Sequence, residues 1–228
     1  MISSSSSTRL SYKDRRRHQK RRLRLTLLLT LAVLLFLLLS SFVLQPWVLD
    51  TSAMEPGYPP GTRFLVLTYA FGGTPERGDV VAVSPPYRPR DSWPAAVFKP
   101  VLRFVTFQKA GNGDEPIFKR VIAVPGDVVK MQNSEARVKT ASESFFLSEF
   151  EVSGREYDIA VPQLPEGWKG PLSGNMDELT LDNDDFFILG DNRGASNDSL
   201  YWGAVSSRDI RGRVIFIYWP FKSFGFPR

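Results

Sequence analysis

The sequence predicts a mainly β protein, with an antiparallel β-rich domain behind one N-terminal transmembrane helix. Three observations predict this fold class. Residues 25–44 form an uncharged, leucine-rich segment; short β-branched and aromatic runs separated by Gly and Pro begin at Arg63; and no convincing helix longer than two turns appears after residue 50. A chain of 228 residues can bury a sizeable core, and its length favours one domain with attachments.

Residues 1–24 form a basic tail, which sets the predicted orientation. The tail holds nine Lys and Arg against one Asp, whereas the other 204 residues hold 20 basic and 23 acidic residues. Positive flanks of a membrane segment stay on the cytoplasmic side. We therefore expect a cytoplasmic tail at 1–24 and an extracytoplasmic domain at 46–228. No nucleic-acid partner is expected, since the basic charge is confined to the tail.

Residues 25–45 are the predicted transmembrane helix. The stretch LTLLLTLAVLLFLLLSSFVL (25–44) has twenty residues without a charge. At roughly 1.5 Å per residue it spans about 30 Å, the thickness of the hydrocarbon core of a bilayer. Two alternatives stay open: a cleavable signal peptide that ends near Ser40-Ser41, and an organelle transit sequence. A retained single-pass anchor makes the lipid bilayer the first predicted partner.

Residues 46–228 are predicted to form the β-rich domain. Most of its expected strands are runs of four to eight residues: RFLVLTYAF, DVVAVS, AVFKPVLRFVTF, FKRVIAV, DVVKM, DFFILG and RVIFIYW. Turn sequences such as Pro125-Gly126-Asp127 separate them. Residues 84–97 are predicted to form a long loop, and residues about 131–180 a less regular, strand-poor insertion.

Composition excludes several kinds of site. The chain has no Cys, so it has no disulfide and no thiol nucleophile, and its one His, His18, lies in the basic tail. A His-dependent triad or a His-rich zinc site is therefore excluded. The acidic group Asp182, Asp184 and Asp185 lacks the spacing of a calcium loop and is interpreted as a solvated turn. No metal and no cofactor are expected, and any hydrolytic chemistry must use hydroxyls, lysines or carboxylates.

Four stretches occur in an order that is typical of one enzyme family. They are SAMEPGYPPGTRFLV (52–66), RGDVVAV (77–83), FKRVIAVPGDVV (118–129) and FFILGDNRGASNDSLYWGAV (186–205). Together, behind an N-terminal anchor, they resemble type I signal peptidases, the leader peptidase family of membrane-anchored Ser/Lys endopeptidases. The resemblance implies a β-rich catalytic domain at a membrane surface that removes signal peptides from exported proteins. It implies a bacterial plasma membrane, with an organelle membrane as the alternative.

Lys119 and Arg120 start one of the predicted strands. A cationic pair on a strand is usually solvated, but neighbouring side chains point to opposite faces, so one of the two can point inward. A Lys in apolar surroundings loses proton affinity and can serve as a neutral general base. The resemblance implies that Lys119 is this base. It also implies that Arg120 is structural and pairs with Asp191.

The GDNRGASNDS stretch supplies the predicted supporting residues. Taken alone, it is a polar turn. The resemblance implies that Ser196 orients the amine of Lys119, and that Asp191, Arg193 and Asp198 hold the site rigid. One departure concerns Leu200, since family members often have a basic residue there. A salt bridge from Asp198 to that position is excluded, and the partner of Asp198 stays open.

The nucleophile position shows the largest departure from the family pattern. The sequence Met54-Glu55-Pro56 sets the register and places Ala53 where the family has its nucleophilic Ser. Thr51 occupies the upstream hydroxyl position, and the resemblance implies that Thr51 and the backbone amide of Ala53 stabilise the oxyanion. Because alanine has no oxygen that could attack a carbonyl, the chain is not expected to form an acyl-enzyme.

Three explanations of Ala53 stay open. The first is a deliberate Ser→Ala substitution in an active enzyme, and the second is a natural inactive homologue that binds signal peptides without cleaving them. In the third, Ser52 takes over as nucleophile, although a one-residue slip turns its side chain to the other face of an extended segment. A structural, membrane-anchored β-domain is a further alternative, but it gives no reason for the four motifs.

The resemblance also predicts the substrate and its binding residues. Family substrates carry small residues, typically Ala, at the first and third positions before the cut. Shallow apolar pockets and pairing of the substrate backbone with an edge strand would explain this preference. The candidate lining residues are Met54, Pro56, Phe64, Val81, Ala82 and Val83.

Overall fold

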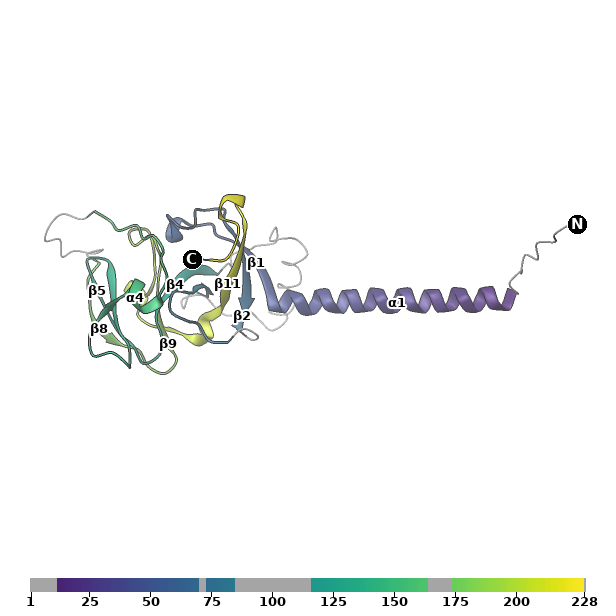
Figure 1. Cartoon of the computed structure of the whole chain (residues 1–228), viewed down its shortest axis with the longest axis horizontal. Helices are drawn as coiled ribbons and strands as arrows, with labels where there is room; N and C mark the ends of the chain where they lie inside the picture. Colours follow the sequence, from purple (N-terminus) through teal and green to yellow (C-terminus); the bar gives the residue numbers. More distant parts are fainter. Residues whose placement is uncertain (1–11, 70–72, 85–115, 164–173, 228) are drawn as a thin grey trace, which may run out of the picture. The chain divides into compact units, whose positions relative to one another are not determined.

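The computed structural model describes residues 12–69, 73–84, 116–163 and 174–227. The chain falls into two compact units, Met1–Ser41 and Phe42–Arg228. Helix α1, Tyr12–Val43, accounts for the described part of the first unit (Figure 1). Of the helices in the described residues, none has both the length and the hydropathy of a membrane span. Of the predicted transmembrane helix at 25–45, residues up to Val43 are helical, whereas Leu44 and Gln45 belong to a strand, and the helix is not supported as a membrane span.

The larger of two sheets has seven strands in the order β1-β2-β11-β3-β4-β9-β10, and each pair of neighbours is antiparallel. The mainly antiparallel β class is thereby confirmed. The strands are β1 Leu44–Val48, β2 Arg63–Thr68, β3 Val80–Val83, β4 Ile117–Ala123, β9 Asp185–Leu189, β10 Val205–Ser206 and β11 Ile210–Trp219.

The second sheet has four strands in the order β7-β6-β5-β8. Its elements are β5 Val128–Gln132, β6 Glu135–Lys139, β7 Leu147–Ser148, helix α4 Glu149–Ser153 and β8 Met176–Thr180. The prediction of a strand-poor insertion at 131–180 is therefore wrong for its two ends, since β5 and β6 occupy most of residues 131–139 and β8 occupies 176–180. The missed sequence signal is the alternation of Ala136 and Val138, which are buried, with charged residues. Asn133 and Ser134, both at positive φ, form the turn before this strand.

Short elements and connections complete the described chain. They are the 3-10 helices Ser52–Met54 (η1), Ser207–Asp209 (η2) and Phe221–Ser223 (η3), and helix α5, Ser199–Trp202. Every described helix after residue 50 is two turns or shorter, as predicted. The predicted strand at 96–107 lies wholly outside the described residues, and so does the predicted loop at 84–97 apart from Ser84.

The two sheets share one part of the core. Strands β4 and β9 of the larger sheet lie beside the smaller one (Figure 1) and pack against β5 and β6. The shared cluster consists of Ile122, Ala123, Val129, Met131, Ala136, Val138, Leu181, Phe187 and Leu189. Burial of such side chains is the main force that joins the sheets. Strand β4 is thus held on both sides, and it carries the two predicted cations.

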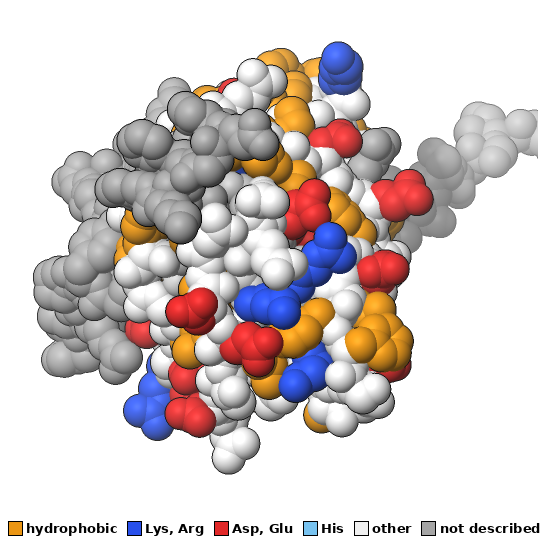
Figure 2. Space-filling model, turned by 90° about the vertical axis from the view of Figure 1, so that its left-hand side faces the viewer, with side chains coloured by type: hydrophobic (Ala, Val, Ile, Leu, Met, Phe, Trp, Pro, Cys, Tyr) orange, Lys and Arg blue, Asp and Glu red, His pale blue; other side chains and the backbone are white. Residues whose placement is uncertain are grey.

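The surface of the β-rich unit has mixed charge on the face drawn in Figure 2, where basic, acidic and apolar side chains are interspersed. This mixture agrees with the charge count, since the excess of Lys and Arg lies in residues 1–24.

Candidate active site

Three segments meet at the candidate site: η1, strand β4 and the loop between β9 and α5. The loop begins at Gly190 and is fastened to η1 by Asn192. The backbone amide of Asn192 donates to the carbonyl oxygen of Ala53 at 3.0 Å, and its Nδ2 donates to the carbonyl oxygen of Ser52 at 3.2 Å. These bonds join two predicted motifs that are far apart in the sequence. Sequence reasoning missed Asn192 as an individual site residue.

Gly190 brings Ala53 and Ser196 close together. A Cβ atom at Gly190 would lie 2.3 Å from Ser196 Oγ and 2.5 Å from the carbonyl oxygen of Ala53. Both distances are far below van der Waals contact, so any side chain at this position would push the two segments apart. The glycine is therefore needed for close approach rather than for an unusual φ.

Lys119 is buried and bonded to a hydroxyl. Its Nζ donates to Ser196 Oγ at 2.7 Å, and its side chain is 2% exposed. Burial, the largest influence, lowers the Lys119 pKa from 10.5 to about 8, although the carboxylates of Asp198 and Asp191 act in the opposite direction. A substantial fraction of this amine is therefore neutral in weakly alkaline solution, which is the state that a general base requires.

Asp198 has partners other than the missing basic residue at position 200. Its Oδ2 accepts from Ser196 Oγ at 2.5 Å and from the Gly190 amide at 2.9 Å, and its Oδ1 accepts from the Leu200 amide at 3.2 Å. Because the hydroxyl proton of Ser196 is directed to Asp198, a lone pair of Ser196 Oγ is left to accept from Lys119. The open question of the partner of Asp198 is answered by these three contacts.

Arg120 forms the buried ion pair that was predicted. Its Nε donates to Asp191 Oδ1 at 2.8 Å and its Nη2 to Asp191 Oδ2 at 2.7 Å, and both residues are 1% exposed. Nη1 donates to the carbonyl oxygen of Gly78 at 2.9 Å. The planar guanidinium matches the carboxylate with two parallel bonds, a geometry that lysine cannot provide.

Arg193 connects the loop to the smaller sheet. Its guanidinium donates to the carbonyl oxygens of Gly190 at 3.0 Å and Ser134 at 2.7 Å, and to Glu149 Oε2 at 2.5 Å. Glu149 also accepts from the hydroxyl of Tyr157 at 2.7 Å. Sequence reasoning missed Glu149 and Tyr157. The Ser148–Glu151 capping pair predicts a helix start there, but it gives no indication of what Glu149 contacts.

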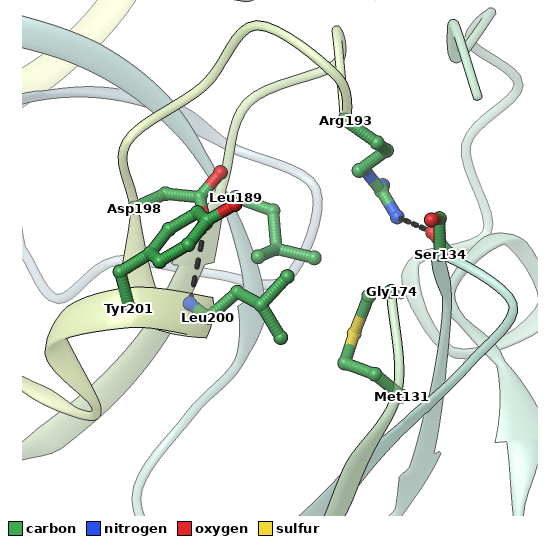
Figure 3. Close-up of a pocket in the computed structure, with 8 residues that line it drawn as sticks. All are labelled: Met131, Ser134, Gly174, Leu189, Arg193, Asp198, Leu200 and Tyr201. Carbon is green, nitrogen blue, oxygen red and sulfur yellow. Dashed lines mark hydrogen bonds between the residues drawn. The ribbon is translucent and has the colours of Figure 1, made fainter. Parts of the chain in front are cut away.

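A small pocket lies behind this loop (Figure 3). Asp198, Leu200 and Tyr201 come to it from one side, while Arg193, Ser134 and Met131 come from the other. Figure 3 also shows the bonds from Arg193 to Ser134 and from the Leu200 amide to Asp198. The pocket therefore lies where the site loop packs against the smaller sheet.

None of the side-chain hydrogen bonds given above involves Thr51 or the candidate lining residues, although Val81 pairs with Lys119 across β3 and β4. Thr51 is exposed and precedes η1 without a side-chain bond to it, so its role at the oxyanion stays a prediction. Five of the six candidate lining residues are buried, namely Met54, Phe64, Val81, Ala82 and Val83, whereas Pro56 is exposed. Met54, Phe64 and Ala82 belong to one core cluster. Their predicted role in substrate binding also stays a prediction.

A family model and two relatives that match this chain are all described as signal peptidases. Residues 22–219 match the model of a family described as signal peptidase, peptidase S26. A probable signal peptidase I-2 of Synechocystis sp. is 27% identical over 197 residues, which cover 85% of this chain and 72% of that protein. Signal peptidase IB of Staphylococcus aureus is 26% identical over 200 residues, which cover 85% of this chain and 87% of that protein.

A solved structure also matches. It is a signal peptidase I from Enterococcus faecalis V583, 21% identical, with a TM-score of 0.33. The match covers 62% of this chain and 97% of the other.

Proposed function

Since its residues 22–219 match the family model, the chain belongs to the signal peptidase, peptidase S26 family, and we propose that its site binds signal peptides of exported preproteins. We further propose that a Ser at position 53 would make it cleave them with Lys119 as general base. The observation that carries the proposal is the bond from the buried Lys119 amine to Ser196 at 2.7 Å, beside the backbone of Ala53.

With Ser at position 53, the reaction would proceed through an acyl-enzyme. Neutral Lys119 would take the hydroxyl proton while the serine oxygen attacks the peptide carbonyl. The Thr51 hydroxyl and the amide of residue 53 would receive the oxyanion. The Lys119 ammonium would protonate the departing amine, and water activated by the same amine would then release the acyl group from the serine.

With Ala53, the chain cannot perform the first of these steps. Alanine supplies a methyl group at the attacking position, although its carbonyl oxygen accepts the bond from the Asn192 amide. This residue favours a second function, the capture of signal peptides without cleavage. Small residues at the first and third positions before the cut are the proposed recognition feature, and Met54, Pro56, Phe64 and Val81–Val83 are the proposed lining.

A location at a bacterial plasma membrane is proposed on two sequence features. Residues 25–44 carry no charge, and the basic tail precedes them. This proposal expects a single-pass chain with a cytoplasmic N-terminus. Its test is extraction of the expressed chain from vesicles at high pH, together with protease accessibility of the two ends. Release into the soluble fraction would exclude it.

The activity is tested by restoring the hydroxyl. Purified Ala53→Ser is expected to cleave a precursor whose signal peptide ends in Ala-x-Ala, and Ala53→Ser with Lys119→Ala is expected to be inert. The unaltered chain should bind the same signal peptide and leave it intact. If Ala53→Ser binds the peptide but does not cleave it, capture without cleavage is the function. If neither form binds it, both proposals are wrong.

A further inference from the structure

Glu149 is a buried charge outside the motifs of the site. It begins helix α4 and is 2% exposed. Its Oε2 accepts from Arg193 Nη2 at 2.5 Å and from the Tyr157 hydroxyl at 2.7 Å, and its Oε1 accepts from the Ala136 amide at 3.3 Å. A carboxylate is costly to remove from water unless it is paired and hydrogen-bonded. Glu149 therefore depends on these partners, and they depend on Glu149.

One chain of contacts runs from Glu149 through Arg193 to Ser196. Arg193 Nε donates to the carbonyl oxygen of Gly190 at 3.0 Å, and the amide of Gly190 donates to Asp198 at 2.9 Å. Asp198 in turn accepts from the hydroxyl of Ser196. The carbonyl of Gly190 is thus held by Arg193, which is itself bonded to Ser134 and Glu149, and its amide is held by the residue that orients Ser196.

A second chain of contacts runs through Tyr157. The guanidinium carbon of Arg120 lies 3.8 Å from the centroid of the Tyr157 ring, and Arg120 holds Asp191 by two bonds. Burial, followed by the nearby Glu149 carboxylate, raises the pKa of Tyr157, so its hydroxyl stays protonated and remains a donor to Glu149. Both chains start at Glu149 and end in the loop that contains Gly190 and Asp191.

We infer that Glu149 is a positioning residue of the active site, which through Arg193 and Tyr157 fixes the loop from Gly190 to Asp198 against η1 and Lys119. The lack of space at Gly190 makes the loop sensitive to such a residue. A Cβ atom at Gly190 would clash with both Ser196 Oγ and the carbonyl oxygen of Ala53, so the glycine lies close to both and a small shift of it is expected to displace them. The smaller sheet, which contains no predicted catalytic residue, thus acts on the site.

The first test is amide hydrogen exchange on the full chain as it exists, which needs no activity. In Glu149→Gln, which keeps the shape and removes the charge, we expect the Gly190 and Asn192 amides to exchange about tenfold or more faster. The Val66 amide in β2 should change less than about threefold. Tyr157→Phe, which keeps the ring over Arg120, should have a smaller effect in the same direction. It replaces Glu149→Gln if that variant fails to fold.

Glu178→Gln is the matched control, since it removes an exposed carboxylate from the same sheet. It should leave the Gly190 and Asn192 exchange rates unchanged. Equal acceleration of the Val66, Gly190 and Asn192 amides in the Glu149 and Tyr157 variants would mean a merely structural role and overturn the inference. Unchanged rates at Gly190 and Asn192 would also overturn it.

The second test is kinetic and rests on the proposed function. In the Ala53→Ser background, Glu149→Gln is expected to lower kcat about tenfold or more while KM changes less than about threefold, because the reacting groups lose their alignment. A fall in active-site titre at constant kcat would overturn the inference. If Ala53→Ser itself is inert, the proposed activity is wrong, and the exchange experiment alone decides the role of Glu149.

Discussion

The two neighbouring cations of strand β4 occupy environments that differ in one respect. Lys119 and Arg120 are 2% and 1% exposed, so both have lost their water. Arg120 gains two bonds to the Asp191 carboxylate, whereas Lys119 donates to the neutral hydroxyl of Ser196. The difference teaches that burial alone does not make a base. A buried cation with a directly bonded carboxylate keeps its proton, and one held by a hydroxyl gives it up more easily.

The largest effect is expected from breaking the buried ion pair of Arg120 with Asp191. Arg120→Met should lower the free energy of unfolding by about 3–5 kcal/mol, because it leaves the Asp191 carboxylate buried without its partner. Urea unfolding measures this change. The double variant Arg120→Met with Asp191→Leu should recover part of the loss. A single variant as stable as the unaltered chain would contradict the importance of the pair.

Lys119, which has no directly bonded carboxylate in the described part of the chain, should make the stability of the protein depend on pH because it is buried. The Lys119 pKa is about 8 in the folded chain and 10.5 ordinarily, so between these values the unfolded chain binds more protons. The free energy of unfolding should therefore rise with pH in this window, by up to about 3 kcal/mol in total. Below pH 8 the cost of burying the charge is fully present.

Lys119→Met is the reference for this measurement, since other groups titrate in the same window. Unfolding curves of the two proteins at several pH values give the difference directly. Across this window the stability of the unaltered chain should gain up to about 3 kcal/mol relative to that of the variant. Parallel stability curves would show that the amine titrates normally and would remove the physical basis for a neutral base.

The pH dependence of activity sharpens the same point. In Ala53→Ser, kcat/KM should rise with pH and reach half of its plateau near pH 8, the value at which half of the Lys119 amine is neutral.

Ser196→Ala in that background should lower kcat about 10- to 100-fold, because Lys119 loses its acceptor. Initial rates with a signal-peptide substrate measure both effects. A flat pH profile would contradict the first, and an unchanged kcat in Ser196→Ala would contradict the second.

The smallest effect is expected from an ion pair whose side chains are exposed to solvent. Lys130 and Glu178 are 3.6 Å apart, with side chains 25% and 56% exposed. Glu178→Gln should change the free energy of unfolding by less than about 1 kcal/mol, since solvent screens the pair. Urea unfolding beside Arg120→Met compares the two directly. A loss as large as that of Arg120→Met would mean that burial is not what separates them.

Of the runs predicted as strands, five correspond to strands of the larger sheet, which also contains β1 and β10, and one, DVVKM, corresponds to a strand of the smaller sheet. RFLVLT, VVAV and DFFIL were predicted as strands because most of their residues are apolar, β-branched or aromatic. Strand β6 reads EARVK, and only Ala136 and Val138 mark its buried face. Such a weak alternation among charged residues resembles an irregular segment. The motif residues Lys119, Arg120 and Asp191 were predicted, whereas Glu149 was not, because its partners are distant in the sequence.

By itself, the sequence determined the chemistry that is on hand: no thiol, one histidine in a tail, a methyl group at position 53, and a Lys-Arg pair in a strand. These are properties of single residues and of their order. Apart from the family resemblance, which implied the pair of Arg120 with Asp191, only the tertiary structure decided which cation receives a carboxylate. It alone decided that Asp198 accepts from Ser196. The physical reason is that proton affinity depends on lost water and on close charges, and both are set by segments that meet only when the chain folds.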